Sequence, residues 1–378
     1  MKLATTALVF CVAALLALGM VMLYSSSMAD KGMHYLIMQC LWGSVGLVSC
    51  VIAACVDYRL LKKLAWPILI FSIVLLVFVL AGPANYAPRI NGARRWLNFH
   101  GFRFEPSELA KLALIIAVAW YGDHFQRKMH TFKNGIVLPG IMIGFVLAFI
   151  FVEPDRGTTI LMAGVTGIML VVCGARLKFI VPPGALALAA FGFSLLYDPM
   201  RRARMLAWLH PEEHKMDIGY QANQAMLALG AGGWTGVGLG NSRQKLGFLP
   251  EHHTDFILAI VGEELGLVAT LLVVLTFIII IACGLYIAGR SSDTFGLLLA
   301  SGLTSLIGLQ AVINVGVVTN TLPNKGLPLP FISYGGSNLL MMLTAIGLLV
   351  SVARKARPVN ANVSETVEAD AIPSPQLS

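Results

Sequence analysis

Five ionisable residues, in addition to Glu251, stand where a polar, glycine-rich stretch meets a long apolar run, within residues 249–267. They are His252, His253, Asp255, Glu263 and Glu264. Charged groups at the edge of a hydrocarbon layer are costly to hold there, so they are candidates for function by default. On one straight helix Asp255 and Glu263 would be separated by about 12 Å along the axis. They therefore cannot form a tight carboxylate pair, and the partner of Asp255 has to come from elsewhere in the chain.

The adjacent histidines raise the question of a metal site. Neighbouring residues on regular structure point in different directions, and no further His at ligand spacing completes a zinc set. A hard divalent cation such as Mg²⁺ or Mn²⁺, held by carboxylate oxygens, is the better alternative. We assign no residue as a metal ligand and leave the divalent cation as an open alternative.

A second polar pair lies at the start of another apolar run. Pro106 suits the first turn of a helix, and Glu108 stands where a carboxylate faces the N-terminal amides. Glu108 and Lys111 are three residues apart, so they share a helix face and can pair. An ordinary stabilising pair is the alternative to function. Function is favoured because Lys111 lies a full turn inside the apolar run, where an unpaired ammonium is expensive.

Basic residues gather in two loops that we place on the outer side of a membrane. Arg94 and Arg95 lie in the loop 83–105, and Arg243 and Lys245 lie in the loop 197–253. Positive charge on the outer side opposes the usual topology signal, which indicates that these residues bind an anion there. Contact with lipid headgroups remains the alternative.

Residues 322–338 contain three prolines and three glycines between fully apolar flanks. This composition forbids a continuous helix but is compatible with an ordered, re-entrant loop buried in protein. We expect that loop to position Lys325 and Ser333.

The composition indicates what kind of protein positions these residues. Of 378 residues, 57% are hydrophobic and 12% are charged, and the mean hydropathy is +0.78, which is typical of an integral membrane protein. The net charge of +8 is spread over short loops rather than gathered in one block, so nucleic acid is not an expected partner.

Because lipid offers the backbone no hydrogen bonds, we expect an all-α bundle of about ten transmembrane helices. The apolar runs that predict them lie at about 4–24, 35–56, 64–82, 107–121, 135–152, 158–174, 178–197, 257–288, 295–320 and 332–353. The eighth run is too long for one straight span, and Gly262 and Gly266 are natural places for it to bend or begin.

The distribution of Lys and Arg favours both termini inside the cell. Residues 1–355 then form one polytopic membrane domain, with a large extracytoplasmic loop at about 198–253 before the eighth helix. The aromatic and apolar content of that loop argues against disorder. Residues 356–378 are rich in Pro, Ser, Ala and Glu and are expected to form a disordered cytoplasmic tail.

Together these motifs resemble the SEDS family of bacterial cell-envelope proteins, over roughly residues 4–355. Five motifs carry the resemblance and appear in family order: Asn91 to Leu97, Pro106 to Lys111, Glu153 to Thr158, Pro250 to Gly266 and Leu322 to Asn338. Residues 238–246 and 322–327 are more similar to the division-specific FtsW branch than to the elongation-specific RodA branch. The sequence departs from the common pattern at Arg156, where Leu is more usual, and at Asn324, where Thr is frequent.

The resemblance implies a peptidoglycan glycosyltransferase that polymerises lipid II in the bacterial inner membrane, at the division septum. It implies Asp255 as the general base and places Glu108 and Lys111 at positions important for activity. Our own assignment from charge placement gives pyrophosphate binding to Arg94, Arg95, Arg243 and Lys245. His253, Lys325 and Ser333 are further candidates for substrate binding.

The implied partners are a class B penicillin-binding transpeptidase of the FtsI type, other membrane proteins of the divisome, and membrane lipid. Two alternatives remain open. A lipid II flippase would use the same lipid groove, but would call for polar residues through the midplane and for internal repeats. A division scaffold without catalysis would not need buried acids.

Overall fold

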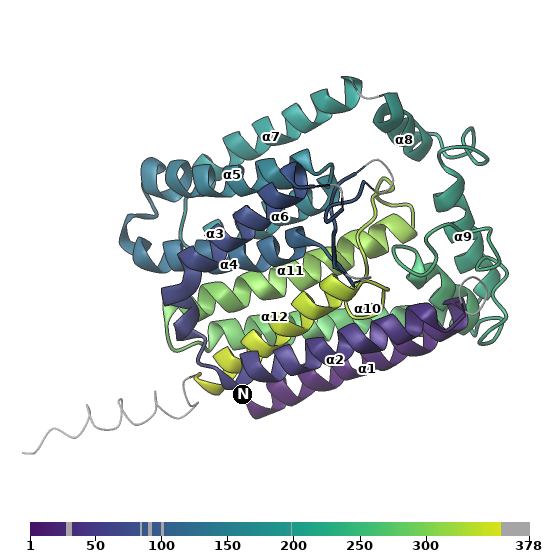
Figure 1. The fold of residues 1–378 in the computed structure, drawn as a ribbon, viewed down its shortest axis with the longest axis horizontal. Helices are drawn as coiled ribbons and strands as arrows, with labels where there is room; N and C mark the ends of the chain where they lie inside the picture. Colours follow the sequence, from purple (N-terminus) through teal and green to yellow (C-terminus); the bar gives the residue numbers. More distant parts are fainter. Residues whose placement is uncertain (28–31, 84, 90–92, 100–101, 198, 357–378) are drawn as a thin grey trace, which may run out of the picture.

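The chain folds into a bundle of helices that run roughly parallel to one long axis in this computed structural model (Figure 1). The structure describes all residues except 28–31, 84, 90–92, 100–101, 198 and 357–378. The expected disordered tail therefore lies, apart from Ala356, outside the described residues.

Each of the ten apolar runs coincides with a helix. These helices are α1 (Lys2–Ser27), α2 (His34–Cys55), α3 (Arg59–Ala81), α4 (Pro106–His124), α5 (Leu138–Val152), α6 (Arg156–Val172), α7 (Leu177–Tyr197), α10 (Ile257–Gly289), α11 (Thr294–Val318) and α12 (Gly336–Arg354). A short π-helical turn, Lys133–Val137, leads into α5.

Seven of these segments are long and apolar enough to cross a membrane on length and composition alone. The α4 helix misses that standard because it carries three charged residues, Glu108, Lys111 and Asp123. The α6 helix and the apolar stretch Leu177–Leu186 of α7 are shorter. The expectation of an all-α, multi-pass membrane protein is confirmed.

The interior of the bundle is built on α4, α11 and α12, which are buried along most of their length. The α2 helix packs on α12, α3 packs on α4, and α10 packs on both α1 and α11. The outward sides of α2, α3 and α10 carry large apolar side chains such as Val48, Phe71 and Leu272, as expected of surfaces in contact with lipid.

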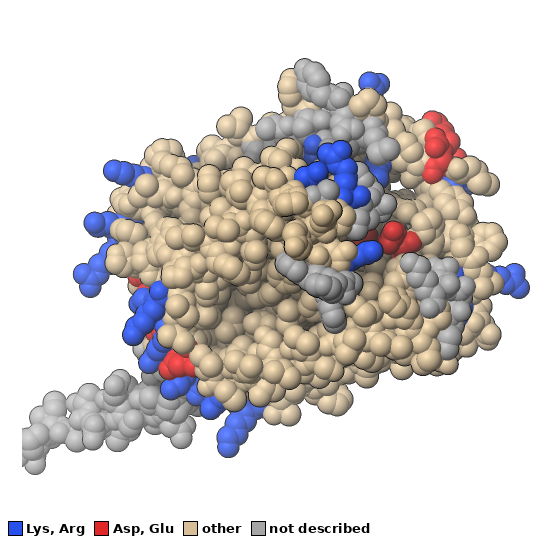
Figure 2. All heavy atoms as spheres, in the orientation of Figure 1, with Lys and Arg blue, Asp and Glu red and all other residues tan. Residues whose placement is uncertain are grey.

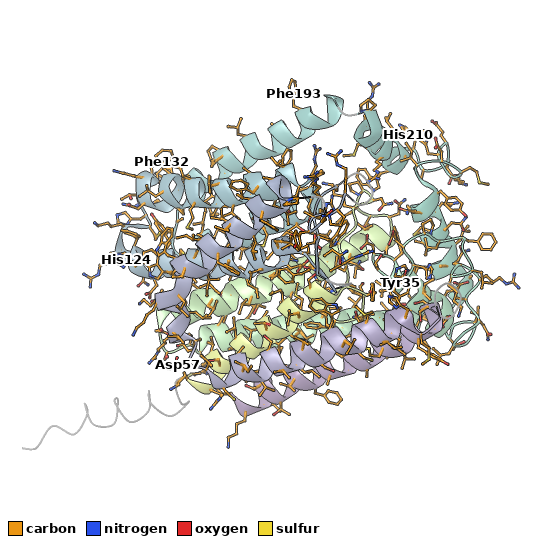
Figure 3. The ribbon with its side chains drawn as sticks, viewed as in Figure 1. Tyr35, Asp57, His124, Phe132, Phe193 and His210 are labelled. Carbon is orange, nitrogen blue, oxygen red and sulfur yellow. The ribbon has the colours of Figure 1, made fainter. Side chains whose placement is uncertain are left out.

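Two ends of the bundle are chemically distinct. The N-terminus and the end of α12 lie together at one end (Figure 1). Asp57 and His124 lie toward that end, whereas Tyr35 and His210 lie toward the other (Figure 3). The second end also carries α8 (Pro199–Leu209), α9 (Tyr220–Gly232) and the loops that follow them. The long loop at 198–253 is therefore folded, as its composition indicated.

Two details of the backbone are not visible as apolar runs in the sequence. The loop before α4 contains a two-stranded antiparallel ribbon, β1 (Leu97–Phe99) and β2 (Phe102–Phe104), in which Leu97 pairs with Phe104. The α10 helix is broken at Gly266, whose φ of 81° and ψ of −177° are not helical. The second detail agrees with the expected bend at one of two glycines.

Candidate functional site

The segment just before α10 meets the loop between α11 and α12 at the end of the bundle that carries the long loops. Tyr334 donates its backbone N–H to the carbonyl of His253 at 3.0 Å. The Ser333 hydroxyl donates to the carbonyl of Thr254 at 2.6 Å and accepts the N–H of Leu329 at 2.7 Å. These bonds hold the two segments together. The predicted site residue Ser333 thus lies at their junction, with its hydroxyl bound to backbone on both sides.

Asp255 is positioned from two sides. The Asn314 amide of α11 donates to the Asp255 carbonyl at 2.8 Å and to the Leu327 carbonyl at 2.7 Å. Gly326 packs directly on the carboxylate, since a Cβ at position 326 would lie 2.0 Å from Asp255 Oδ2. Only a residue without a side chain fits there, so the glycine in the loop is required for the carboxylate to occupy its place.

The surroundings of Asp255 suit a carboxylate that exchanges a proton near neutral pH. Burial, helped by the nearby Glu251 and Asp155 carboxylates, raises the pKa of Asp255 to about 7. The Arg95 guanidinium acts in the opposite direction. A general base is most effective when its pKa lies near the working pH, and Asp255 meets that condition.

Two acids that were not among the sequence-predicted site residues, Glu105 and Glu153, share the neighbour Asp155 with this carboxylate. Burial, helped by Asp155 and Glu108, raises the pKa of Glu105 to about 8. Burial, helped by Glu105 and Asp155, raises the pKa of Glu153 to about 9. Both side chains are therefore mainly protonated at neutral pH. Each lies beside a proline at the outer end of an apolar run, and this is the sequence signal that could have identified them.

Arg95 crosses from its own loop to the turn between α5 and α6. Its guanidinium donates to the carbonyl of Glu153 at 3.0 Å and to that of Pro154 at 2.6 Å. Arg94 approaches the carbonyls of Leu80 and Gly82 at the end of α3, at 3.5 and 3.4 Å. The structure thus brings Arg95, but not Arg94, into the electrostatic surroundings of Asp255.

Glu108 and Lys111 form the predicted ion pair, with 2.8 Å between Lys111 Nζ and Glu108 Oε2. The pair is buried under the α11–α12 loop and is extended by hydrogen bonds to two amide side chains. Asn338 donates to both Glu108 oxygens at 3.2 and 3.3 Å, and Lys111 donates to Gln310 at 3.3 Å. Gln310 in turn donates to the carbonyl of Pro328 at 2.8 Å. This network supports the loop from below rather than facing solvent.

Two more predicted residues lie in the same loops. Burial and the nearby Arg156 guanidinium lower the pKa of Lys325 to about 8, while Asp155 acts in the opposite direction. The His253 ring stacks on Tyr35 of α2, with 4.5 Å between ring centroids, and lies 5.9 Å from the Tyr334 ring. Asp155, Glu105 and Glu153 form an acidic cluster, and Lys325 is a predicted cation beside it, next to Asp155. His253 instead packs among aromatic rings.

The remaining two predicted cations lie against the first turns of α10. Lys245 forms a buried ion pair with Glu264, with 2.8 Å between Nζ and Oε1. The backbone N–H of Arg243 donates to Glu263 at 2.9 Å. Lys245 thus has an anionic partner of its own in the protein.

Within the residues that the structure describes, no group of three or more His, Cys, Asp or Glu is arranged to hold a metal ion. A cation held by one or two carboxylates together with a substrate phosphate does not need such a group, so the divalent cation stays an open alternative.

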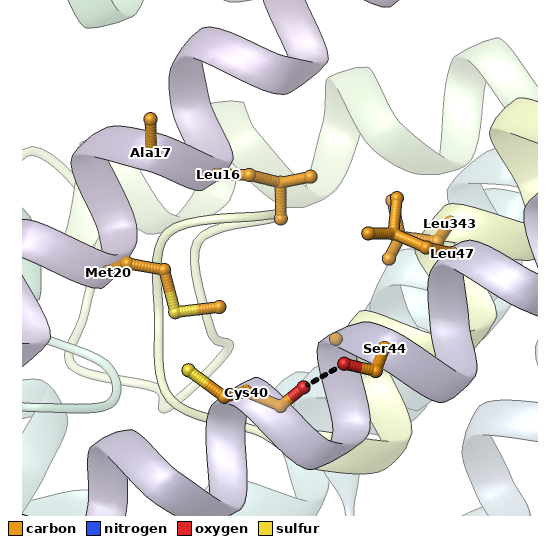
Figure 4. Close-up of a pocket in the computed structure, with 8 residues that line it drawn as sticks. Leu16, Ala17, Met20, Cys40, Ser44, Leu47 and Leu343 are labelled. Atoms are coloured by element: carbon orange, nitrogen blue, oxygen red, sulfur yellow. Dashed lines mark hydrogen bonds between the residues drawn. The ribbon is translucent and has the colours of Figure 1, made fainter.

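Two pockets are lined mainly by apolar side chains and do not include Asp255. One, of about 250 Å³, lies between α1, α2 and Leu343 (Figure 4). Its single hydroxyl, that of Ser44, donates to the carbonyl of Cys40 in its own helix. The other, of about 470 Å³, lies between α10 and α11 and extends to Leu322. Such surfaces suit acyl chains or apolar helices rather than sugars.

A helical bundle with apolar flanks and a half-buried acidic and basic cluster at one end defines a polytopic membrane protein with a membrane-edge site. Comparison with known proteins gives the family. The sequence model of the FtsW/RodA/SpoVE cell cycle proteins matches residues 6–358. The chain belongs to this family, which confirms the resemblance drawn from its motifs.

The relatives favour the FtsW branch. A Geobacter metallireducens protein named "Probable peptidoglycan glycosyltransferase FtsW" is 40% identical over 350 residues, covering 91% of this chain and 93% of the relative. A solved structure that concerns coordination of polymerisation and crosslinking by a peptidoglycan synthase complex is similar with a TM-score of 0.75 and 28% identity, covering 92% of this chain and 96% of that one. The rod shape determining protein RodA of Thermus thermophilus follows with a TM-score of 0.68 and 27% identity, covering 93% and 97%.

Proposed function

We propose that this protein is a peptidoglycan glycosyltransferase that polymerises lipid II, with Asp255 as the general base. The observation that carries the proposal is the environment of Asp255. Its carboxylate packs against Gly326 at the membrane edge, and burial raises its pKa to about 7. The names of the relatives supply the substrate class.

In the proposed reaction a hydroxyl oxygen of the acceptor sugar forms a bond to the anomeric carbon of the donor. The bond from that carbon to the pyrophosphate oxygen breaks, and the leaving pyrophosphate keeps the electron pair. Asp255 accepts the hydroxyl proton. Lys325, beside the acidic cluster, is the cation that we assign to the developing negative charge on the pyrophosphate.

A lipid-linked substrate also needs a path for its acyl chain. Figure 2 shows the apolar face hollowed between α3 and α2, with acidic and basic side chains gathered toward the end of the hollow that carries the loops. The hollow agrees with the packing, in which α2 lies on α12 and α3 lies on α4. We assign the hollow to the lipid tail and the charged end to the disaccharide pyrophosphate.

The topology proposed with this function places the Asp255 end outside the cytoplasm and both termini inside. The opposite end, where Asp57 and His124 lie (Figure 3), also carries the Lys62–Asp123 ion pair and the last turn of α12 with Arg354, and basic residues there agree with the positive-inside rule. The solved relative in a synthase complex supports a class B transpeptidase as partner. The FtsW relatives support a place among divisome proteins at the septum.

The test is lipid II polymerisation by the purified full chain with its cognate transpeptidase, comparing wild type with Asp255→Asn. Loss of a general base is expected to lower the rate by about a hundredfold to ten-thousandfold. Asp217→Asn is the matched control, because it makes the same change at an exposed position of the outer loop. Equal product from wild type and Asp255→Asn would remove Asp255 from the chemistry. No product from wild type, with lipid II crossing vesicle membranes, would favour the flippase alternative.

A further inference from the structure

The α10 helix consists of two pieces that meet at Gly266. A side chain there would have its Cβ 2.4 Å from the backbone nitrogen of Gly236 and 2.5 Å from the carbonyl oxygen of Trp234. The break is therefore filled by the loop that follows α9. Because helical geometry is interrupted, the long membrane piece 267–289 does not by itself fix the short piece 257–265, which directly follows Asp255.

Backbone hydrogen bonds join the short piece to that loop. Val237 and Gly238 donate their N–H groups to the carbonyls of Glu263 and Glu264, at 2.9 and 3.0 Å. Leu267, beyond the break, donates to the carbonyl of Gly233 at 2.9 Å. These bonds satisfy carbonyls and amides that a broken helix leaves without helical partners.

A cluster of buried side chains joins the same piece to α1. We call it the Lys245 cluster, and it comprises Ser25, Ser242, Lys245, Glu263 and Glu264. Lys245 pairs with Glu264 at 2.8 Å and donates to the Ser25 hydroxyl at 3.0 Å, and that hydroxyl donates to Glu264 Oε2 at 2.7 Å. Glu263 accepts the Ser242 hydroxyl and the backbone N–H of Arg243.

This arrangement contributes little net stability, because burying charged groups costs desolvation free energy. Glu263 is 2% exposed, Glu264 0% and Lys245 5%, so the Glu264–Lys245 ion pair and a second carboxylate, bound only by neutral donors in this cluster, all lie away from solvent. Buried ion pairs of this kind roughly break even against apolar side chains of the same volume. What they do specify is geometry, because a displaced partner leaves a charge unpaired. A segment held in this way has one permitted position.

We propose that the Lys245 cluster is a positioning device for Asp255, one that sets the short piece of α10 against α1 and the loop after α9. Asp255 is then held between this piece and the Gly326–Asn314 side of the site. Lys245 acts through Glu264, and its role is distinct from pyrophosphate binding. This inference rests on the proposed function of Asp255 as base.

The test measures steady-state polymerisation of lipid II by the full chain with its cognate transpeptidase. Lys245→Met and Glu264→Gln are both expected to lower kcat by roughly tenfold to a hundredfold with little change in KM, because the base is misplaced while the substrate contacts remain. Lys245→Arg keeps the charge, so its kcat should stay much closer to the wild-type value than that of Lys245→Met. Lys215→Met is the matched control, since it breaks the exposed Lys215–Glu212 pair of the same loop and should have no effect.

A raised KM for Lys245→Met together with wild-type kinetics for Glu264→Gln would overturn the proposal and return Lys245 to the pyrophosphate. If both variants fail to fold, Ser25→Ala decides, because it removes one hydroxyl and keeps the ion pair; an unchanged kcat would overturn the proposal. An active Asp255→Asn would refute the proposed base itself. An inactive Asp255→Asn beside fully active Lys245→Met and Glu264→Gln would refute the positioning role alone.

Discussion

Replacing Lys111 by Met tests whether the polar network under the α11–α12 loop is as desolvated as its geometry indicates. Lys111 is 1% exposed and Glu108 is 5% exposed, so the substitution leaves a carboxylate in the interior without its cation. Removing one partner of a buried pair typically costs about 3–5 kcal/mol. Gln310 Oε1 also loses the Lys111 donor, whereas the two hydrogen bonds from Asn338 to Glu108 remain.

We therefore expect Lys111→Met to lower the free energy of unfolding by about 3–4 kcal/mol, toward the lower end of that range because Asn338 still serves the carboxylate. The assay is equilibrium unfolding in mixed detergent micelles, followed by tryptophan fluorescence. Lys62→Met is the matched control, since it breaks the Lys62–Asp123 pair at the opposite end, where the Lys62 side chain is 45% exposed. That loss should stay below about 1 kcal/mol.

The double variant Glu108→Gln with Lys111→Met separates charge from packing. The carboxamide oxygen of Gln can still accept from Asn338, and no charge is left in the interior, so the double variant should be more stable than Lys111→Met alone. Equal losses in the free energy of unfolding for Lys111→Met and Lys62→Met would refute the reasoning. So would a double variant whose loss equals the sum of the two single losses, because the two residues would then not be coupled.

Four further results are expected. The polymerisation rate should fall by about tenfold per pH unit below pH 7, as Asp255 takes up its proton, and should fall again above pH 8, as Lys325 loses its charge. Lys325→Arg should remove the alkaline fall in the pH–rate profile, because Arg stays charged. Glu153→Gln should make the free energy of unfolding less dependent on pH. Burial raises the pKa of Glu153 from 4.5 to about 9. The free energy of unfolding of the wild type therefore falls by up to about 1.4 kcal/mol per pH unit as pH rises through that window. Denaturant titrations at several pH values measure this, and parallel curves for both proteins would contradict it. Gly326→Ala should lower kcat by roughly a hundredfold in the same polymerisation assay, because the new Cβ displaces the Asp255 carboxylate, and a wild-type rate would show that the carboxylate can move without penalty.

The helices could be predicted because the requirement that creates them is local. Lipid forces each span to satisfy its own backbone hydrogen bonds, so a run of apolar residues is sufficient to indicate a helix. The Glu108–Lys111 pair was predictable for the same reason, since residues three apart on a helix are neighbours. The sequence predicted a break in α10 at Gly262 or Gly266 but could not choose between them. The structure places it at Gly266, whose φ is positive.

The rest of the site depends on contacts between segments far apart in the chain, which spacing does not reveal. Lys245 was assigned to an anion on the basis of its charge and its loop, and the structure supplies an anion from the protein itself, Glu264. Glu105 and Glu153 meet only because α4 and the α5–α6 turn come together at one end of the bundle. The β1–β2 ribbon was read as loop because its strands are too short for a period-two pattern to emerge.

A proton-accepting carboxylate at a membrane edge has two conflicting requirements. It must be desolvated enough for its pKa to approach neutrality, yet water and a lipid-linked substrate must still reach it. A straight transmembrane helix cannot meet both, because its polar residues lie either in the bundle or in lipid. The loop around Gly326 brings backbone close to the Asp255 carboxylate with no side chain at position 326, while the break at Gly266 separates the short piece of α10 after Asp255 from the membrane piece. The buried pairs Glu108–Lys111 and Glu264–Lys245 then lie beneath the two broken elements, one under each. In this arrangement the charges that do not react hold in place the one that does.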